Sequence, residues 1–414
     1  MGLIQQLYEK IKMNKSLLIT ILTVGIPIIM QLFFIRYVSY SVNKDIYGNF
    51  ILLQTLIIAL SYIFLQIPSQ AYNRFYNSAT NKIEFVNEFR TLLIFINIFS
   101  VVVIYIYGLI MERFTYEILA LVFIYFLILN NYTFNQQIFL LNLERKKYFV
   151  LKNLEAVSKF LLPILFFLYF ESLESLLYGM VCGYFVSFLF LLTYLKDYKF
   201  NFIITVNNLK KYFKFAYPIL FVAIFSWGIS FLDRYFIDYY MTTKDVAIYA
   251  ILAQVAGIGQ VLGQIYGMYV NPKVLKYYEE DQKFALNYLK RSIVFLSISF
   301  MFLGIIAYIL PTSIYELLLQ KEVINDSYYF NTFIILVFAI FFTLIQTALS
   351  MYLTLFKKLN ILAYIYVVAF IINLIGNMFI NQYGIIAASI STLLAYLVIL
   401  ILELIYIKRY IYEL

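Results

Sequence analysis

Histidine is absent from the 414 residues, and cysteine occurs once, at Cys182. Without histidine the chain has no His-ligated zinc centre, no Ser-His-Asp triad and no His-based proton relay. A single cysteine forms neither an intramolecular disulfide nor a cysteine-ligated metal centre, and Cys182 is expected to pack as a small apolar residue. We therefore expect neither a metal site nor a cofactor.

Charge is also scarce. Charged residues make up 13% of the chain and hydrophobic residues 64%, with a mean hydropathy of +0.86. A soluble protein of this size would have too little polar surface to face water, so the solvent of most of the chain must be a lipid bilayer. The start lacks the features of a cleavable signal peptide. Its apolar residues share one helical face beside several lysines, which predicts an interfacial amphipathic segment at 1–15.

Long apolar runs occur twelve times, each close to the 17–25 residues that cross a bilayer as a helix. The sequence therefore predicts an all-α integral membrane protein with twelve transmembrane helices. The predicted spans are 16–38, 46–67, 90–111, 116–140, 154–170, 173–195, 212–240, 246–271, 291–311, 329–353, 359–380 and 383–407.

The connecting segments are short and basic. The longest are 68–89, 196–211, 272–290 and 312–328, and none is long enough to fold as a catalytic domain. With the N-terminus inside, cytoplasmic segments hold 24 of the 31 Lys and Arg residues, outer loops hold four and spans hold three. This asymmetry follows the positive-inside rule. The net charge of +9 therefore reflects topology and not a nucleic-acid surface, and both termini are expected in the cytoplasm.

The two halves of the chain resemble each other. The segment 196–211 is expected to be a cytoplasmic linker between an N-terminal six-helix lobe, 1–195, and a C-terminal six-helix lobe, 212–414. Similar short motifs recur about two hundred residues apart, which predicts a parallel internal repeat. Transporters built this way bind substrate between their halves. The matched pairs are Arg36-Tyr37 with Arg234-Tyr235, Lys146-Lys147 with Lys357-Lys358, and Tyr178-Gly179 with Tyr383-Gly384.

Three charges stand together in FLDRYFID, residues 231–238, at the outer end of the seventh span. Inserting a charged side chain at the middle of a bilayer costs about 2.5–3.5 kcal/mol, so each of these charges is expected to have a structural or functional role. One interpretation is a cluster that anchors the helix end at the interface, with Arg234 meeting Asp238 four residues on. The other is that Arg234 faces a cavity and binds a phosphate group, with Asp233 and Asp238 as its resting partners. Arg36 occupies the matching place in the first span.

Other polar residues in the spans also allow two interpretations. Lys159 either pairs with Glu155 on its own helix or contacts substrate together with Arg74. The amides of NNYTFNQQ, residues 130–137, bind either sugar hydroxyls or neighbouring helices, and we name Asn131 and Asn135 as candidates. The Gly259, Gly263 and Gly267 stripe predicts close helix packing. Gln260 and Gln264 beside it are candidate cavity residues.

Several stretches resemble the polysaccharide and O-antigen lipid flippases of the multidrug/oligosaccharidyl-lipid/polysaccharide exporter superfamily. The longest is the C-terminal run FKKLNILAYIYVVAFIINLIGNMFINQYGIIAASISTLLAYLVIL; NPKVLKYYEEDQ, LNLERKKYFVLKN and LQIPSQAYNRFYN also resemble family loops. In the last of these the chain keeps Arg74 but has Pro68 where the family commonly has glycine.

The resemblance implies two six-helix bundles around a V-shaped central cavity in the bacterial inner membrane. It implies alternating access that moves an oligosaccharide on undecaprenyl diphosphate, such as an O-antigen or capsule unit for lipopolysaccharide or polysaccharide biosynthesis, from the inner to the outer leaflet. Membrane lipids, a proton or sodium ion as coupling ion, a polysaccharide polymerase and a chain-length regulator are the implied partners.

Two other functions remain open. An ion-coupled multidrug exporter of the same superfamily would need a buried acidic cation site, for which Asp233 is the one candidate that we expect deep in a span. A membrane glycosyltransferase or polymerase would need larger outer loops, and catalysis does not require two equivalent halves. We therefore expect a transporter and not an enzyme, with the substrate contacts Arg36, Arg234, Asp233, Arg74, Lys159, Asn131, Asn135, Gln260 and Gln264.

Overall fold

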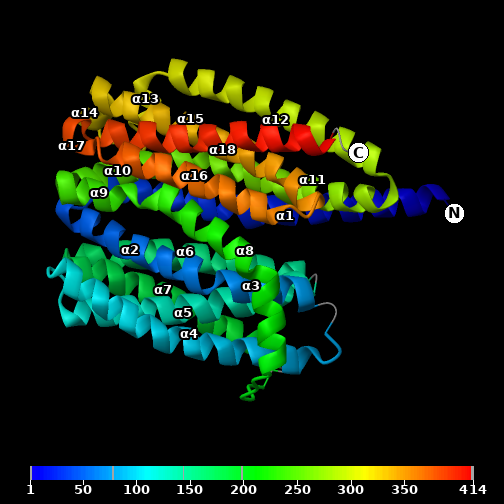
Figure 1. Cartoon of the computed structure of the whole chain (residues 1–414). Helices are drawn as coiled ribbons and strands as arrows, with labels where there is room; N and C mark the ends of the chain where they lie inside the picture. Colours follow the sequence, from blue (N-terminus) through cyan, green and yellow to red (C-terminus); the bar gives the residue numbers. More distant parts are fainter. Residues whose placement is uncertain (1, 77–78, 143, 197–198, 412–414) are drawn as a thin grey trace. The chain divides into compact units, whose positions relative to one another are not determined.

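The computed structural model describes residues 2–76, 79–142, 144–196 and 199–411, and all the regular secondary structure in these ranges is helical (Figure 1). Within these ranges, twelve helices or helix pairs are long and apolar enough to cross a membrane. They coincide with the twelve spans predicted from the sequence, from Leu22–Ser41 to Ile385–Arg409. The all-helical prediction is confirmed, and the chain is a multi-pass membrane protein.

The chain divides into two compact units, Met1–Tyr37 with Ile63–Ala216, and Val38–Tyr62 with Tyr217–Leu414. Residues 38–62 lie in the second unit, whereas the lobe boundaries proposed from the sequence place them in the first. The first unit contains most of α1 (Gly2–Ser41), the start of α8 (Val206–Phe231), and α3 (Gln66–Phe75), α4 (Lys82–Met111), α5 (Tyr116–Leu141), α6 (Arg145–Phe170) and α7 (Leu173–Tyr194).

The second unit contains the remaining helices. It begins with α2 (Lys44–Phe64) and the end of α8. The others are α9 (Asp233–Tyr240), α10 (Thr243–Ala256), the 3-10 turn η2 (Gly257–Gly259), α11 (Gln260–Glu280), α12 (Gln282–Ile309), α13 (Thr312–Tyr315), α14 (Lys321–Ile324), α15 (Ser327–Leu355), α16 (Leu359–Asn377), α17 (Ile380–Tyr383) and α18 (Ile385–Ile411).

Local capping sets several helix starts. The Ser172 hydroxyl accepts from the backbone N–H of Ser175, and the Ser175 hydroxyl accepts from that of Ser172, which closes a capping box at the start of α7. Thr242 and Asp245 form the same arrangement at α10. Each box satisfies two backbone donors that a helix start leaves without intrahelical partners.

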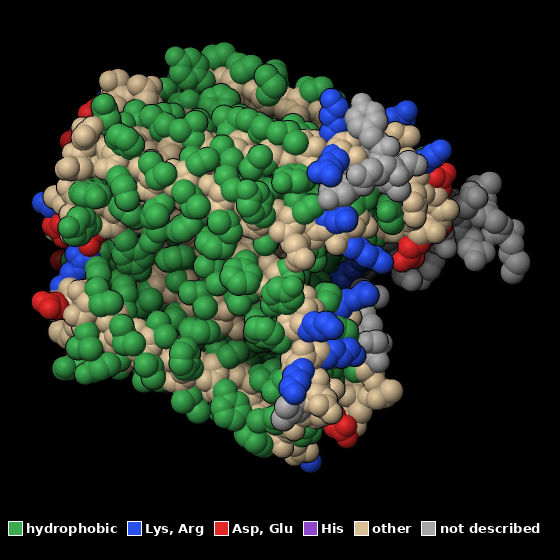
Figure 2. Space-filling model, in the orientation of Figure 1, with side chains coloured by type: hydrophobic (Ala, Val, Ile, Leu, Met, Phe, Trp, Pro, Cys, Tyr) green, Lys and Arg blue, Asp and Glu red, His purple; other side chains and the backbone are tan. Residues whose placement is uncertain are grey.

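Apolar side chains cover the outer faces of the helices. On α4, Ile98 and Ile110 are 62% and 74% exposed, and on α12 Phe295 is 74% exposed. Within each unit the visible apolar surface follows the length of the helices, and Lys and Arg gather near helix ends (Figure 2). Faces this large and this apolar are stable against lipid chains and would aggregate in water.

Two predicted spans are interrupted. The seventh breaks at Leu232, between α8 and α9, so Asp233 is the first residue of a new helix. The eighth passes through η2. In the predicted glycine stripe, a Cβ on Gly263 would lie 2.2 Å from Leu344 of α15, whereas one on Gly267 would meet only Asn271, at 3.7 Å. The stripe therefore supports close packing at Gly263 and not along its whole length.

The helix α1 runs without interruption from Gly2 to Ser41. The side chains of residues 1–18 lie outside the described part of the structure. The expected interfacial segment at 1–15 therefore stays a prediction.

The predicted topology is testable with reporter fusions. Fusions after Lys211 and at the C-terminus should report the cytoplasm, and fusions at Thr243 and Lys321 should report the outside. The reason is the 24-to-4 division of Lys and Arg between the two sides. An outside signal after Lys211 would contradict both the assigned sidedness and the equal orientation of the two halves.

Candidate functional site

The break between α8 and α9 holds a buried ion pair. Asp233 is 2% exposed and Arg234 8%. The Nη1 atom of Arg234 lies 3.3 Å from Oδ1 of Asp233 and donates to the carbonyl of Ser230 at 2.8 Å. The backbone N–H of Arg234 also donates to Oδ1, and its guanidinium lies 4.7 Å from the ring centre of Phe231. Arg234 is therefore held inside the second unit.

The second carboxylate oxygen of Asp233 is bound as well. The hydroxyl of Tyr249, on α10, donates to Oδ2 at 2.5 Å. The sequence pointed to both Asp233 and Asp238 as partners of Arg234. The ion pair with Asp233 is formed, in the first turn of α9, and the pairing with Asp238 stays a prediction. Tyr249 was missed as a partner, although it matches Tyr47 of the internal repeat, whose buried hydroxyl bonds to Gln254.

Buried amides of the second unit join helices to one another. On α16, Asn373 donates to Ser391 and Thr392 of α18, at 3.3 and 3.4 Å. The next amide on this face, Asn377, donates to Asn373 and accepts from Ser391 at 2.7 Å. For these residues the interhelical interpretation is the one that the geometry supports.

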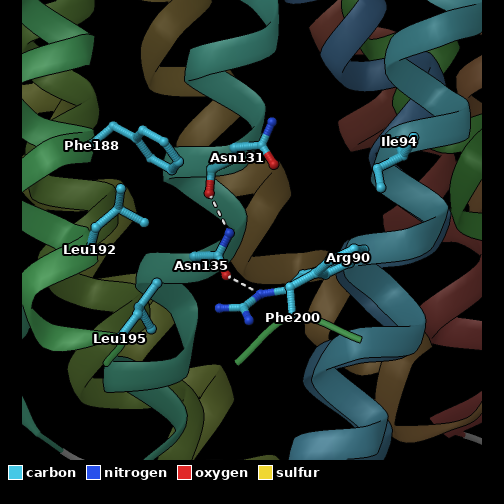
Figure 3. Close-up of a pocket in the computed structure, with 8 residues that line it drawn as sticks. All are labelled: Arg90, Ile94, Asn131, Asn135, Phe188, Leu192, Leu195 and Phe200. Carbon is cyan, nitrogen blue, oxygen red and sulfur yellow. Dashed lines mark hydrogen bonds between the residues drawn. The ribbon is translucent and has the colours of Figure 1, made fainter. Parts of the chain in front are cut away.

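A pocket of about 300 Å³ opens in the first unit. Its polar side chains come from α4 and α5, and its apolar ones come from α4, from α7 and from the segment that follows α7 (Figure 3). The lining residues are Arg90, Ile94, Asn131, Asn135, Phe188, Leu192, Leu195 and Phe200. The pocket contains two of the residues proposed from the sequence, Asn131 and Asn135.

A chain of hydrogen bonds orders the polar side of this pocket. Nε of Arg90 donates to Oδ1 of Asn135 at 2.8 Å, and Nδ2 of Asn135 donates to the carbonyl of Asn131 at 2.8 Å (Figure 3). The amide of Asn131 in turn donates to the carbonyl of Leu127. A positioned guanidinium and an amide facing apolar side chains suit a ligand with an anionic or hydroxyl-bearing group beside a hydrocarbon part.

Arg90 was missed as a site residue because it lies at the cytoplasmic start of a predicted span. There it was counted among the basic residues that follow the positive-inside rule. The signal was there: Arg90 precedes an apolar run and lies where α4 can bring it beside the amide-rich turn of α5. The position of a residue along its helix does not show which neighbouring helix its side chain faces. The pairing of Arg90 with Asn135 could therefore be found only in the structure.

The remaining proposed residues lie elsewhere. Lys159 is 3.3 Å from Glu155, which also pairs with Lys152 at 2.9 Å, so the intrahelical ion pair is formed. Arg36 and Arg74 are exposed, as are Gln260 and Gln264 at the start of α11. Arg36 belongs to the first unit and Arg234 to the second, and their pairing stays a prediction.

A buried acidic residue was missed in the sequence. Glu403 of α18, four residues before the end of the predicted span 383–407, is fully buried and accepts from Nε2 of Gln346 at 3.3 Å. The signal was a single glutamate in the apolar run ILILELIYI, residues 399–407.

Comparison with known proteins identifies the fold. The MatE family model matches residues 218–379. No curated protein sequence matches the chain. Among solved structures, the lipid II flippase MurJ in an inward closed conformation has a TM-score of 0.73 and 15% identity, covering 95% of this chain and 87% of that one.

Two further structures are multidrug transporters. An inward-facing MATE family transporter of the MOP superfamily has a TM-score of 0.70 and 14% identity, over 95% of this chain and 98% of that one. The Vibrio cholerae MATE transporter VcmN has a TM-score of 0.67 and 11% identity, over 96% of both chains. The chain therefore has the fold of these structures, which is that of the multidrug/oligosaccharidyl-lipid/polysaccharide exporter superfamily.

Proposed function

We propose that the protein is a flippase for a lipid-linked oligosaccharide. Its substrate class is an oligosaccharide on undecaprenyl diphosphate, such as an O-antigen or capsule unit, moved from the inner to the outer leaflet of the bacterial inner membrane by alternating access. The observation that carries the proposal is the pocket of the first unit, where Arg90 and Asn135 face five apolar side chains. A phosphate or sugar beside a polyprenyl chain has this same division of polarity.

At Asp233, the candidate cation site named from the sequence, the contacts support this proposal over export of cationic drugs. A drug cation would need a carboxylate with free oxygens. Both oxygens of Asp233 are bound, one by Arg234 and the other by Tyr249. The pair therefore presents a cation held by a carboxylate, which is the arrangement expected for an anionic substrate that competes for the guanidinium.

The other residues proposed from the sequence are proposed as further substrate contacts. Arg36 and Arg234, matched in the internal repeat, are proposed to bind the diphosphate. The further proposed contacts are Asn131, Arg74, Lys159, Gln260 and Gln264. A polysaccharide polymerase and a chain-length regulator are the proposed partners downstream.

Reconstitution tests the function directly. Proteoliposomes carrying a fluorescent undecaprenyl-diphosphate glycan should move it between leaflets faster than protein-free vesicles, as read by quenching of the outer leaflet. The glycan should keep its chain length and linkage, because transport changes neither. No acceleration would contradict the flippase, and a lengthened or transferred glycan would favour the enzyme.

The pocket makes a separate prediction. Arg90→Ala removes one charge-assisted hydrogen-bond donor, worth about 1.5–3 kcal/mol, so affinity for the fluorescent lipid should fall roughly tenfold to a hundredfold. Binding is measured on purified protein in detergent. Arg291→Ala, which removes an exposed arginine of α12, is the matched control and should bind normally. Equal affinities for the two variants would remove Arg90 from the site.

A further inference from the structure

Glu403 lies in the membrane-spanning part of α18 and is fully buried. The helix packs against α15 and α16, which close over this carboxyl group. None of the functions proposed above uses it. An isolated carboxylate in such a place loses its hydration, and the cost is several kcal/mol unless a cation or several donors replace the water.

The hydrogen bonds around Glu403 are one donor short. Nε2 of Gln346, on α15, donates to Oε1 of Glu403 at 3.3 Å and to the hydroxyl of Tyr366, on α16, at 2.9 Å. The other oxygen of each partner, Oε2 of Glu403 and Oε1 of Gln346, is buried without a hydrogen-bond partner. Two such acceptors on two side chains that already touch are the arrangement expected when one proton is shared between them.

No cation compensates the carboxyl group. Among the described residues Glu403 forms no ion pair. From α16 it faces the uncharged phenol of Tyr366, and from α15 the uncharged amide of Gln346. Asp233 and Arg234 of α9 form an ion pair with each other, so Arg234 does not compensate Glu403.

The basic side chains of α18 are at its far end. Lys408 and Arg409 lie exposed in its last turn, five and six residues beyond the glutamate. Glu155 in the first unit has a different environment. Glu155, 5% exposed in a spanning helix, is paired with both Lys152 and Lys159 and is stable as a carboxylate. Burial of a glutamate alone therefore does not decide its charge; the presence or absence of cations does.

We propose that Glu403 and Gln346 form a proton-binding site in the second unit. The proton sits on Oε2 of Glu403 and is donated to Oε1 of Gln346, so that the acid and the amide form a two-hydrogen-bond pair and both orphaned oxygens are satisfied. The proton is taken from water, and it returns to water only when the packing of α15 and α16 on α18 opens. A transport cycle that opens this packing on one side of the membrane then carries a proton with it. This inference holds for any substrate and does not rest on the lipid-linked glycan.

Infrared spectroscopy of the full-length protein in nanodiscs tests the protonation without substrate. The carbonyl stretch of a protonated carboxyl group is resolved from that of a carboxylate and shifts in D₂O. We expect such a band at neutral pH, its loss in Glu403→Gln, and its retention in the matched control Glu155→Gln. A band unchanged in Glu403→Gln would overturn the proposal.

A second variant keeps the test valid if Glu403→Gln does not fold. Gln346→Leu leaves the carboxyl group in place and removes its hydrogen-bond partner, so the carbonyl band should move to higher frequency. An unmoved band would show that the amide does not bind the proton, and the site as described would be wrong.

The coupling is tested in proteoliposomes with the fluorescent lipid-linked glycan. Wild-type transport should accelerate under an imposed pH gradient, and Glu403→Gln, which imitates the protonated acid permanently, should lose that acceleration. Gradient-dependent transport that survives in Glu403→Gln would overturn the coupling. If the infrared band behaves as expected but the glycan is not moved, the flippase proposal fails and the proton site stands.

Discussion

Replacing Arg234 with alanine is expected to abolish transport and to lower the free energy of unfolding by about 3–5 kcal/mol, because it leaves the buried Asp233 carboxylate without its cation. The acid would keep the hydrogen bond from the Tyr249 hydroxyl and lose the ion pair, in which Nη1 of Arg234 donates to Oδ1. Stability is measured by thermal unfolding in detergent, and transport by leaflet exchange in proteoliposomes.

Companion variants separate the two effects. Asp233→Asn combined with Arg234→Ala removes both charges, so stability should recover largely while transport stays lost if the guanidinium binds substrate. Arg234→Lys should retain part of the activity, because an ammonium keeps the charge without the bidentate fork. Arg234→Ala that transports normally at normal abundance would mean that the cluster in FLDRYFID only anchors the helix.

The helices of this protein are predictable from its sequence because the bilayer imposes their length. Each span needs a long apolar run, and twelve such runs are visible without any knowledge of packing. The MOP-type fold also followed from loose motifs, and the structural matches agree with it. The local composition of the sequence therefore determines where each helix lies along the chain.

Which side chains meet depends on how each helix is rotated about its axis, and composition does not show this. Asp233 and Asp238 were both expected beside Arg234, and the ion pair with Asp233 forms in the first turn of α9. Tyr249, sixteen residues away, reaches the same carboxylate only because α10 packs beside α9. Arg90 and Glu403 were each visible in the sequence, yet their partners Asn135 and Gln346 lie on other helices.

A second pair of packing glycines was not singled out in the sequence. Gly179 and Gly183 of α7 lie against the backbone of α6, whereas Gly263 of the predicted stripe lies against the side chain of Leu344. A Cβ on Gly179 would lie 2.3 Å from Cα of Pro163, and one on Gly183 would lie 2.8 Å from Cα of Lys159. The sequence GMVCG, residues 179–183, has the small-xxx-small spacing that lets two backbones approach in a membrane.

Gly179→Leu is therefore expected to disrupt the first unit severely. The atoms that a new side chain would meet are backbone atoms of Leu162 and Pro163, which cannot rotate away as a side chain can. Relief requires α6 and α7 to separate, and this would also break the hydrogen bonds of the Ser158 hydroxyl to the Gly183 carbonyl and to Ser187. Overpacking of a well-filled interior costs about 1–3 kcal/mol when side chains can adjust, and we expect a larger loss here.

The measurement is the midpoint of thermal unfolding in detergent, together with the yield of folded protein from the membrane. Gly25→Leu is the matched control, because this glycine lies in α1 of the same unit and a Cβ there meets nothing within 4 Å. Its midpoint should stay near that of the wild type, whereas Gly179→Leu should unfold at a much lower temperature. Gly179→Ala should fall between the two, since one methyl group demands a smaller separation than an isobutyl group. Equal midpoints for Gly179→Leu and Gly25→Leu would show that α6 and α7 do not approach backbone to backbone, and the pocket that α7 helps to line would then need a different wall.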